Sequence, residues 1–465
     1  MADATAIDGR SIEQFLEDTN ERRRAAYVDL LRIPSISALP EHAPDIRRAA
    51  EWVAGELRRI GMEHVDVSET GGAPIVYADW LHADGAPTAI AYAHYDVQPV
   101  DPVGEWRHPP FEPTVEGDRM LARGSSDDKG NLAILLQAAE ALLATRGGLP
   151  INLRFVFEGE EETTSEHLEP WLAANRDRLA GDVALICDGG FFPGNLPAIT
   201  VGLRGIMYAQ IDVRGPFQDV HSGSYGGSVE NPANALAQII AALKGPDGRI
   251  RIPGFYDDVA PISEADREAW ARLPFDEDAY RAGLEVDRLV GETGYTTLER
   301  RGARPTLDVN GMWAGFQGDG SKTIIPGEAH AKVSCRLVVD QDPERIFESL
   351  KSFVTEIAPP GVHVSVHSLG TGRPTLTSTE LPATQAAARA IERAFGRAPV
   401  FMREGGSIPF VATFENLLKL PVVLLGFVPP DGNFHAPNEW MDLGNFETGI
   451  RATIELFDEL AALPR

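Results

Sequence analysis

The chain contains little cysteine and little positive charge. Two cysteines in 465 residues are too few for a disulfide framework, and this number favours a reducing compartment. Lys and Arg number 42 against 69 Asp and Glu, which gives a formal net charge of -27. A charge of that sign repels nucleic acids and anionic membranes. We therefore expect no nucleic acid and no membrane among the partners of this chain.

Long apolar runs are also absent from the sequence. No stretch approaches the roughly 20 apolar residues that a membrane-spanning helix needs. The first residues lack the basic start and the apolar core of a secretory signal peptide. Together with the low cysteine content, these absences predict a cytoplasmic protein. The remaining composition, 43% hydrophobic, is typical of a globular chain with two or three domains at this length.

Strand and helix patterns alternate in the first part of the chain. Residues 88–94 and 183–187 form short apolar runs, which are typical of buried strands. Between them, residues 132–143 repeat apolar side chains at helical spacing, and Ser165 is placed to cap a helix that runs to about residue 179. This alternation predicts an α/β fold with a mainly parallel sheet.

Two helices are predicted before the first of these strands. Ser11 is placed to cap one helix, which ends near Pro34. Residues 46–60 carry a regular apolar stripe, and Gly61 is placed to end that helix.

The pattern changes at about residue 205. From there an α+β order of strands and helices is interrupted by an acidic and aromatic stretch, 247–330, for which the pattern predicts no definite structure. After about residue 370 the alternating pattern of the first part returns. The sequence therefore predicts a discontinuous α/β domain, formed by 1–204 and 371–465, and an inserted α+β domain, 205–370.

Two imidazoles and three carboxylates occur at the ends of predicted strands or in the loops that follow them. These residues are His94, Asp127, Glu162, Asp188 and His435. Because parallel strands end at one edge of a sheet, we expect the five side chains to converge there. Two cations about 3.5 to 4 Å apart need a shared carboxylate and terminal ligands, and mixed imidazole and carboxylate donors suit Zn²⁺, Mn²⁺ or Co²⁺. The pattern therefore indicates a site for two metal ions.

Each motif alone has a plainer structural interpretation. Asp127 and the next residue, Asp128, suit the N-terminus of a helix, where acids complement the helix dipole. Three consecutive glutamates, 160–162, are also typical of a solvated charge run, and Asp188 and His435 could lie in ordinary loops. The coincidence of all these motifs in one chain favours the metal site.

In order and spacing, the motifs resemble those of the co-catalytic metallopeptidase family of carnosine-type dipeptidases, aminoacylases and carboxypeptidase G. The segments that carry the resemblance are His94–Pro99, Arg123–Gly130, Glu158–Glu162 and His435. Within that family the chain is most similar to the cytosolic nonspecific dipeptidase branch. The resemblance implies a hydrolase with a catalytic α/β domain and an inserted lid and dimerisation domain.

The resemblance also implies two divalent metal ions per subunit, zinc or manganese. Asp127 is the expected bridge between the two ions. His94 and Asp188 are expected to complete the ligands of one ion, and Glu162 and His435 those of the other.

Two acidic residues beside these ligands have separate expected roles. Asp96 lies two positions after His94, and alternate side chains of a strand point the same way, so its carboxylate can orient the imidazole. The resemblance implies that Glu161 is the general base, which takes a proton from the water between the metals. Glu158 and Gly159 set the register of the three glutamates that follow them.

The inserted domain contains a second set of candidate residues. His221, in a loop rich in glycine and serine, resembles a family histidine that reaches the neighbouring subunit's active site and stabilises the oxyanion. Arg336, on a predicted strand, suits a bidentate clamp for a substrate carboxylate, although a salt bridge on the sheet face is the structural alternative. Thr323 and Ser407 resemble residues of substrate-contacting loops. The role of His221 implies a homodimer.

The reaction implied by these residues is hydrolysis of the amide bond of a dipeptide or short peptide with a free C-terminal carboxylate. Removal of an N-acyl group from an amino acid, as in aminoacylases or desuccinylases, stays open because the sequence does not define the substrate pocket. A catalytically inactive metal-holding protein is disfavoured, since both Asp96 and Glu161 are present. A phosphoesterase is disfavoured because the motifs have few basic neighbours.

Overall fold

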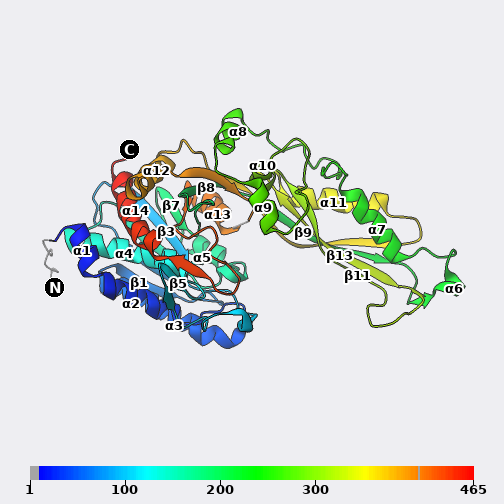
Figure 1. Cartoon of the computed structure of the whole chain (residues 1–465), viewed down its shortest axis with the longest axis horizontal. Helices are drawn as coiled ribbons and strands as arrows, with labels where there is room; N and C mark the ends of the chain where they lie inside the picture. The colour runs from blue at the N-terminus through cyan, green and yellow to red at the C-terminus, as the bar shows by residue number, and fades with distance from the viewer. Residues whose placement is uncertain (1–9, 407–408, 465) are drawn as a thin grey trace. The chain divides into compact units, whose positions relative to one another are not determined.

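The computed structural model describes residues 10–406 and 409–464 (Figure 1). The chain divides into two compact units. The first consists of Met1–Val201, Thr377–Met402 and Phe410–Arg465, and the second of Gly202–Leu376 and Arg403–Pro409. The short return of the chain to the second unit after residue 402 is a feature that the sequence pattern does not indicate.

A nine-stranded sheet forms the centre of the first unit. Some residues of its last strands belong to the second unit. The strand order is β1-β2-β6-β3-β7-β17-β8-β15, and β16 pairs with β8. The pairs β6-β3, β3-β7 and β7-β17 are parallel, whereas the flanking pairs β1-β2, β2-β6 and β17-β8 are antiparallel. The predicted α/β class with a largely parallel central sheet is therefore confirmed. The strands are β1 (Glu63–Ser68), β2 (Ile75–Trp80), β3 (Thr88–His94), β6 (Asn152–Glu158), β7 (Val183–Cys187), β8 (Ala198–Leu203), β15 (Thr375–Leu376), β16 (Val400–Glu404) and β17 (Val422–Leu425).

Helices pack around this sheet, and their sequence patterns account for their positions. The apolar stripe of α3 is buried, and Gly61 ends the helix with φ of 94°, as predicted. Nearly every residue of α4 is buried, because it packs against α3, α14 and β3. The helices of this unit are α1 (Ile12–Asp18), α2 (Asn20–Leu31), α3 (Ala43–Ile60), α4 (Lys129–Arg146), α5 (Leu168–Ala174), α12 (Pro382–Phe395) and α14 (Leu443–Ala461). A smaller sheet contains β4 (Thr114–Glu116), β5 (Arg119–Leu121) and β18 (Trp440–Asp442), and α13 (Pro409–Thr413) crosses the unit boundary.

Two helix predictions need correction. Ser11 does cap a helix, but that helix ends at Asp18 and a second one starts at Asn20. The helix expected from Ser165 begins only at Leu168 and ends at Ala174. Ser165 has φ of 51°, and its hydroxyl donates a hydrogen bond of 3.0 Å to Glu158 Oε1 instead of capping the helix.

The second unit is built on a four-stranded antiparallel sheet with the order β11-β13-β9-β14. Alternate residues of β9 and β13 are buried, and they form one apolar core with α7 and α11. The stretch 247–330, for which no definite structure was predicted, contains three short helices, β11, β12 and the first residues of β13. The elements of this unit are β9 (Gly205–Arg214), β10 (Val220–His221), α6 (Ser222–Tyr225), α7 (Pro232–Leu243), α8 (Glu264–Ala271), α9 (Glu277–Gly283), α10 (Thr297–Gly302), β11 (Thr306–Ala314), β12 (Ile324–Ile325), β13 (Glu328–Leu337), α11 (Pro343–Ile357) and β14 (His363–Gly372).

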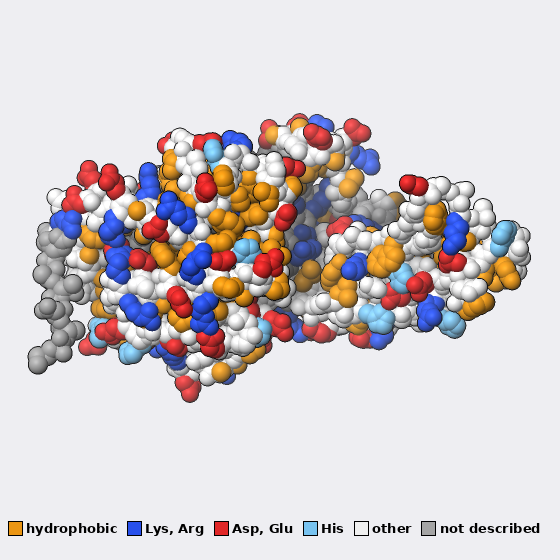
Figure 2. Space-filling view, turned by 90° about the horizontal axis from the view of Figure 1, so that it is seen from below, with side chains coloured by type: hydrophobic (Ala, Val, Ile, Leu, Met, Phe, Trp, Pro, Cys, Tyr) orange, Lys and Arg blue, Asp and Glu red, His pale blue; other side chains and the backbone are white. Residues whose placement is uncertain are grey.

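The apolar content of the helices and the charges on the surface are consistent with the composition of the chain. Among the described residues, no helix is long and apolar enough to cross a membrane. Figure 2 shows acidic and basic side chains interspersed with apolar ones over the face in view. On that face, the excess negative charge of the chain is therefore spread out and does not form one continuous acidic patch.

The central position of α4 leads to a stability prediction. Leu142 is completely buried, so the substitution Leu142→Ala removes packing and leaves a cavity. We expect it to lower the free energy of unfolding by about 2 to 5 kcal/mol, measured by urea denaturation. The control is Leu81→Ala, because Leu81 is 39% exposed and should change the stability by no more than about 0.5 kcal/mol. Equal effects of the two substitutions would contradict the central role of α4.

Candidate functional site

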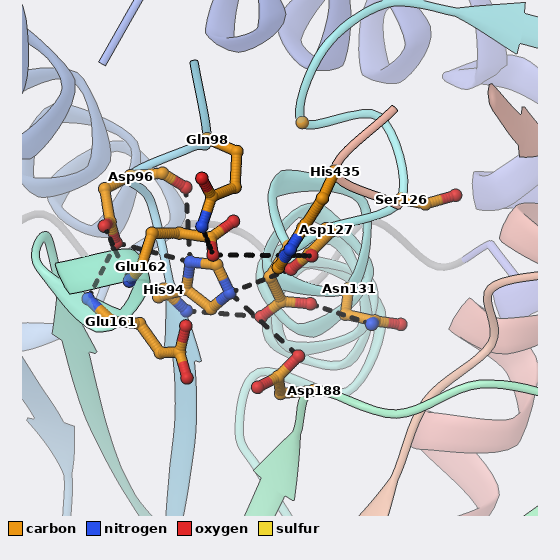
Figure 3. Close-up of polar contacts among 12 residues, drawn as sticks. His94, Asp96, Gln98, Ser126, Asp127, Asn131, Glu161, Glu162, Asp188 and His435 are labelled. Atoms are coloured by element: carbon orange, nitrogen blue, oxygen red, sulfur yellow. Dashed lines mark hydrogen bonds and ion pairs between the residues drawn. The ribbon is translucent and has the colours of Figure 1, made fainter. Parts of the chain in front are cut away.

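The five predicted metal ligands lie together in the first unit (Figure 3). Each comes from the end of a strand or from a loop, as expected from the sequence pattern. His94 ends β3, Asp127 precedes α4, Glu162 lies in the short turn after β6, Asp188 follows β7, and His435 lies in the loop between β17 and β18. The parallel central strands thus deliver most of these side chains to one edge of the sheet.

Asp127 belongs to two groups of possible ligands. One group is His94, Asp127 and Asp188, and the other is Asp127, Glu162 and His435. Within each group, one nitrogen or oxygen atom per residue lies within 4.8 Å of the others. Asp127 Oδ1 lies 3.1 Å from His94 Nε2, and Asp127 Oδ2 lies 3.0 Å from His435 Nε2. Each oxygen of this carboxylate therefore faces a different imidazole, as a bridge between two ions requires.

The carboxylates of Glu162 and Asp188 complete the two groups of possible ligands. Glu162 Oε2 lies 3.2 Å from His435 Nε2, and Asp188 Oδ1 lies 4.0 Å from His94 Nε2. The donors are imidazole nitrogens and carboxylate oxygens, which Zn²⁺, Mn²⁺ and Co²⁺ all accept. Three carboxylates and two neutral imidazoles carry a charge of about −3, which two divalent cations offset. The chemistry of this donor set therefore fits a pair of divalent metal ions.

The electrostatics of the cluster favour positive charge at its centre. Burial acts to raise the pKa of Asp127, but its hydrogen bonds to His435 and His94 hold that pKa well below the ordinary range. Hydrogen bonds to Asp127 and Glu162 raise the pKa of His435 to about 10. Burial acts to lower the pKa of His94, yet its bonds to Asp127 and Asp96 raise it well above the ordinary value. The carboxylates thus stabilise protons or cations bound between them.

Asp96 connects His94 to the loop of glutamates. Its carboxylate is fully buried, and Oδ1 lies 3.3 Å from His94 Nδ1. The same carboxylate accepts hydrogen bonds from the backbone N–H groups of Glu161, at 3.2 Å, and Glu162, at 3.1 Å. One buried side chain therefore fixes both an imidazole and the turn that carries two neighbouring carboxylates.

Glu161 and Glu160 have different surroundings. Burial raises the pKa of Glu161 well above the ordinary range, and the charge of Asp188 adds to this rise although His94 opposes it. Such a carboxyl binds a proton more readily than an ordinary glutamate does. Glu160 instead accepts hydrogen bonds from the backbone N–H groups of His167, at 2.6 Å, and Ala73, at 3.0 Å. Its contacts are those of a residue that holds loops together.

Glu439 is a buried carboxylate that the sequence analysis did not single out. It is completely buried and accepts hydrogen bonds from the backbone N–H groups of Gly124, Ser126 and Asp127, at 2.8 to 3.0 Å. Arg123 Nη1 adds a fourth bond of 2.7 Å. Glu439 therefore shapes the loop that presents Asp127. In the sequence, Glu439 stands among Pro437, Asn438 and the apolar Trp440, and this context gives only a weak sign of its role. Its backbone partners lie more than 300 residues away, so no local pattern reveals them.

Asp128 and Gln98 also support the ligands. Asp128 precedes α4, but its side chain makes no capping hydrogen bond. Its Oδ2 accepts a bond of 3.2 Å from the backbone N–H of His94, and its Oδ1 accepts one of 2.8 Å from Asn131. Gln98 Nε2 donates a bond of 2.7 Å to Glu162 Oε2. Asp128 therefore lies at the N-cap position of α4, as the helix-terminus interpretation expects, but its carboxylate bonds to the backbone at the end of β3.

The remaining predicted residues lie in the second unit. His221 is exposed on β10, and the backbone N–H of the next residue donates a hydrogen bond of 3.0 Å to the carbonyl of Thr323. Arg336 lies on β13, half-buried, and burial lowers its pKa. Ser407 lies outside the described residues. The approach of His221, Thr323 and Arg336 to the metal ligands stays a prediction.

Comparisons with known proteins show which family and which relatives this chain is similar to. The sequence model of the peptidase family M20/M25/M40 matches residues 90–459. The Cys-Gly metallodipeptidase dug1 of Schizosaccharomyces pombe is 32% identical over 471 residues, which cover 97% of this chain and 99% of that protein.

Two solved structures extend the likeness to the whole fold. The dipeptidase Dug1p of Saccharomyces cerevisiae has a TM-score of 0.83 at 25% identity, over 100% of both chains. An M20 family metallo-carboxypeptidase of Sulfolobus solfataricus, Sso-CP2, has a TM-score of 0.84 at 33% identity, over 95% of this chain and 99% of that one. The agreement covers both units of the chain.

The contacts of Glu439 lead to a prediction about metal binding. Glu439→Gln keeps the shape of the side chain but replaces one carboxylate oxygen by an amide, so it cannot accept all four hydrogen bonds. We expect the affinity for Zn²⁺ or Mn²⁺ to fall by about 10- to 100-fold, as for other residues that orient metal ligands. Isothermal titration calorimetry of the metal-stripped protein measures this change. The control is Glu112→Gln, on an exposed loop, and equal affinities of the two variants would refute the role of Glu439.

Proposed function

The chain belongs to the peptidase family M20/M25/M40, and we infer from this membership that it is a metallodipeptidase. It hydrolyses the peptide bond of dipeptides and other short peptides that have a free C-terminal carboxylate. The observation that carries this proposal is the position of Asp127, shared by two ligand groups beside Glu161. The full-length match to a Cys-Gly metallodipeptidase supports dipeptides as the substrate class.

The proposed cofactor is a pair of divalent ions, zinc or manganese. His94 and Asp188 would hold one ion, Glu162 and His435 the other, and Asp127 both. Ions bound there lower the pKa of water and polarise the scissile carbonyl group.

Glu161 is the proposed general base. Its carboxylate takes a proton from the attacking water, whose oxygen forms a bond to the carbonyl carbon of the substrate. When the C–N bond breaks, Glu161 returns the proton to the leaving amine. Its raised pKa suits this shuttle, because the protonated form is then stable between the two steps.

The second unit supplies the proposed substrate contacts. The guanidinium of Arg336 suits the C-terminal carboxylate of the peptide, with Thr323 and Ser407 as further contacts. His221 is proposed to stabilise the oxyanion in the site of a neighbouring subunit. Its exposure on β10 supports a role outside its own unit's core.

A homodimer is proposed together with this role of His221. Strand β11 lies at an edge of its sheet, and it exposes Val309, Met312 and Trp313 by 37% to 48%. Exposed apolar side chains on a strand edge are typical of a protein interface. We therefore propose that the dimer contact lies at β11.

We also propose that the protein is cytoplasmic. Its two cysteines are free and buried, and a reducing compartment keeps such thiols reduced.

The first test is the hydrolysis of a substrate panel by metal-stripped protein with Zn²⁺ or Mn²⁺ restored. The panel contains Cys-Gly, β-Ala-His, a tripeptide, and N-acetyl and N-succinyl amino acids. We expect metal-dependent cleavage of the dipeptides. Cleavage of only the acylated amino acids would contradict the dipeptidase and indicate a deacylase.

The neighbouring glutamates provide a matched pair for the general base. We expect Glu161→Gln to lower kcat for the best dipeptide by about 10²- to 10⁴-fold, because the proton shuttle is lost. Glu160→Gln should retain kcat, since Glu160 bonds to loop backbone. Metal content is measured in both variants. The opposite result, a loss of kcat in Glu160→Gln and not in Glu161→Gln, would show that the general base is assigned to the wrong glutamate.

The two edge strands provide a test of the dimer. Met312→Glu on β11 introduces a charge at a residue that is 48% exposed in the single chain. We expect it to shift the protein from dimer to monomer in sedimentation velocity and to lower the activity per chain. Leu369→Glu on the opposite edge strand, β14, is the control, because Leu369 is similarly exposed at 45%. Wild-type protein that is active and monomeric would rule out the dimer.

A further inference from the structure

The two imidazoles of the candidate metal site are held in different ways. His94 is completely buried, and the buried carboxylate of Asp96 lies 3.3 Å from its Nδ1. His435 is exposed, and its Nε2 faces Asp127 and Glu162 (Figure 3). In the part of the chain that the structure describes, its Nδ1 has no hydrogen-bond partner. The position of this ring therefore depends on the backbone that carries it.

His435 lies in a loop that is closed by two hydrogen bonds. The backbone N–H of Trp440 donates to the carbonyl of Gly432 at 3.0 Å. Asn433 Nδ2 donates to the carbonyl of Asn438 at 3.1 Å. The φ angles of Asn433, His435 and Asn438 are positive, at 57°, 58° and 62°. Such a backbone is unfavourable for residues other than glycine and persists only where neighbouring contacts hold it.

Asn438 supplies such contacts through both ends of its side-chain amide. Its Nδ2 donates a hydrogen bond of 2.9 Å to the carbonyl of Glu105. Its Oδ1 accepts a bond of 2.7 Å from the backbone N–H of Arg107. Both partners lie more than 330 residues earlier in the chain. Asparagine suits this position because it donates, accepts and tolerates a positive φ, whereas aspartate lacks the donor.

The segment that receives these bonds, residues 99–107, is itself fixed beside the site. Arg123 Nη2 donates a hydrogen bond of 3.0 Å to the carbonyl of Pro99. Arg123 Nη1 bonds to the buried carboxylate of Glu439 at 2.7 Å. The guanidinium carbon of Arg123 also lies 5.3 Å from the centre of the Trp106 ring. The segment is therefore a fixed anchor for the loop that carries the exposed imidazole.

We propose that Asn438 is a positioning residue for the metal ion that His435 and Glu162 would hold. Its side chain keeps the loop in the conformation that directs His435 toward that ion, so it acts through this imidazole and not as a ligand. The ion of His94 does not depend on these contacts, because Asp96 orients that ring. This inference rests on the proposed pair of metal ions.

The test compares Asn438→Gly with a matched control, Asn195→Gly, in Zn²⁺ binding to the metal-stripped protein. Glycine accepts a positive φ, so Asn438→Gly removes the two side-chain bonds without straining the loop. Asn195 also has a positive φ, 53°, but its side chain bonds to Asn445, which is not a candidate ligand. Isothermal titration calorimetry measures the affinity for each ion. We expect one ion to bind about 10- to 100-fold more weakly in Asn438→Gly and neither ion to change in Asn195→Gly.

The variant His435→Ala identifies the affected ion. It removes the ligand itself, so only the ion of His94 should still bind with measurable affinity. Adding Asn438→Gly to His435→Ala should cause no further loss, because a residue that acts through His435 then has nothing to position. The remaining ion also reports that the first unit is folded.

Three results would overturn the proposal, and they separate it from the proposed function. If wild-type protein binds two ions and Asn438→Gly equals Asn195→Gly, the metal pair stands but Asn438 has no positioning role. Weaker binding of the remaining ion in the double variant would show that Asn438 stabilises the whole unit. Wild-type protein that binds fewer than two ions would refute the metal pair, and this role of Asn438 with it.

Discussion

The rest of the structure depends on one interaction. The two oxygens of the Asp127 carboxylate each face a different imidazole. A carboxylate can bridge two ions only if both oxygens are held toward different partners, and this requires a fixed backbone before it and a fixed helix after it. The loop is fixed by Glu439, and the helix is α4, which is buried on nearly every side. Helix α4, which is buried along nearly its whole length, therefore begins two residues after this carboxylate.

Two further carboxylates, Asp96 and Glu439, show how such a site is held in place. Both are completely buried, where an isolated charge is strongly unfavourable. Asp96 accepts backbone N–H groups of the turn that carries Glu161 and Glu162, and Glu439 is compensated by the guanidinium of Arg123 together with backbone N–H groups of the loop that presents Asp127. The desolvation of these side chains and the order of the loops are thus coupled: a displaced loop leaves a buried charge without its donors.

Local patterns predict the strands that end at the site, because their apolar runs and the polar residues after them are continuous in sequence. The same patterns fail where distant contacts decide the structure. Ser165 has the chemistry of a helix cap, but Glu158 engages its hydroxyl, and Asp128 is drawn to the backbone of His94. Glu439 could not be singled out, since its partners lie some 310 residues earlier. The stretch 247–330 folds into short helices and an edge strand whose burial depends on the rest of the second unit.

The order of the sheet has a consequence for the synthesis of the chain. Strand β17 lies between β7 and β8, yet its residues follow β8 by more than 200 positions. His435 and Glu439 come later still. A nascent chain released from the ribosome up to residue 200 already holds His94, Asp127 and Asp188, but its sheet has a gap beside β7. Only the last tenth of the chain fills that gap and supplies His435, which completes the second group of possible ligands, so the full set of candidate ligands cannot assemble before translation is almost finished.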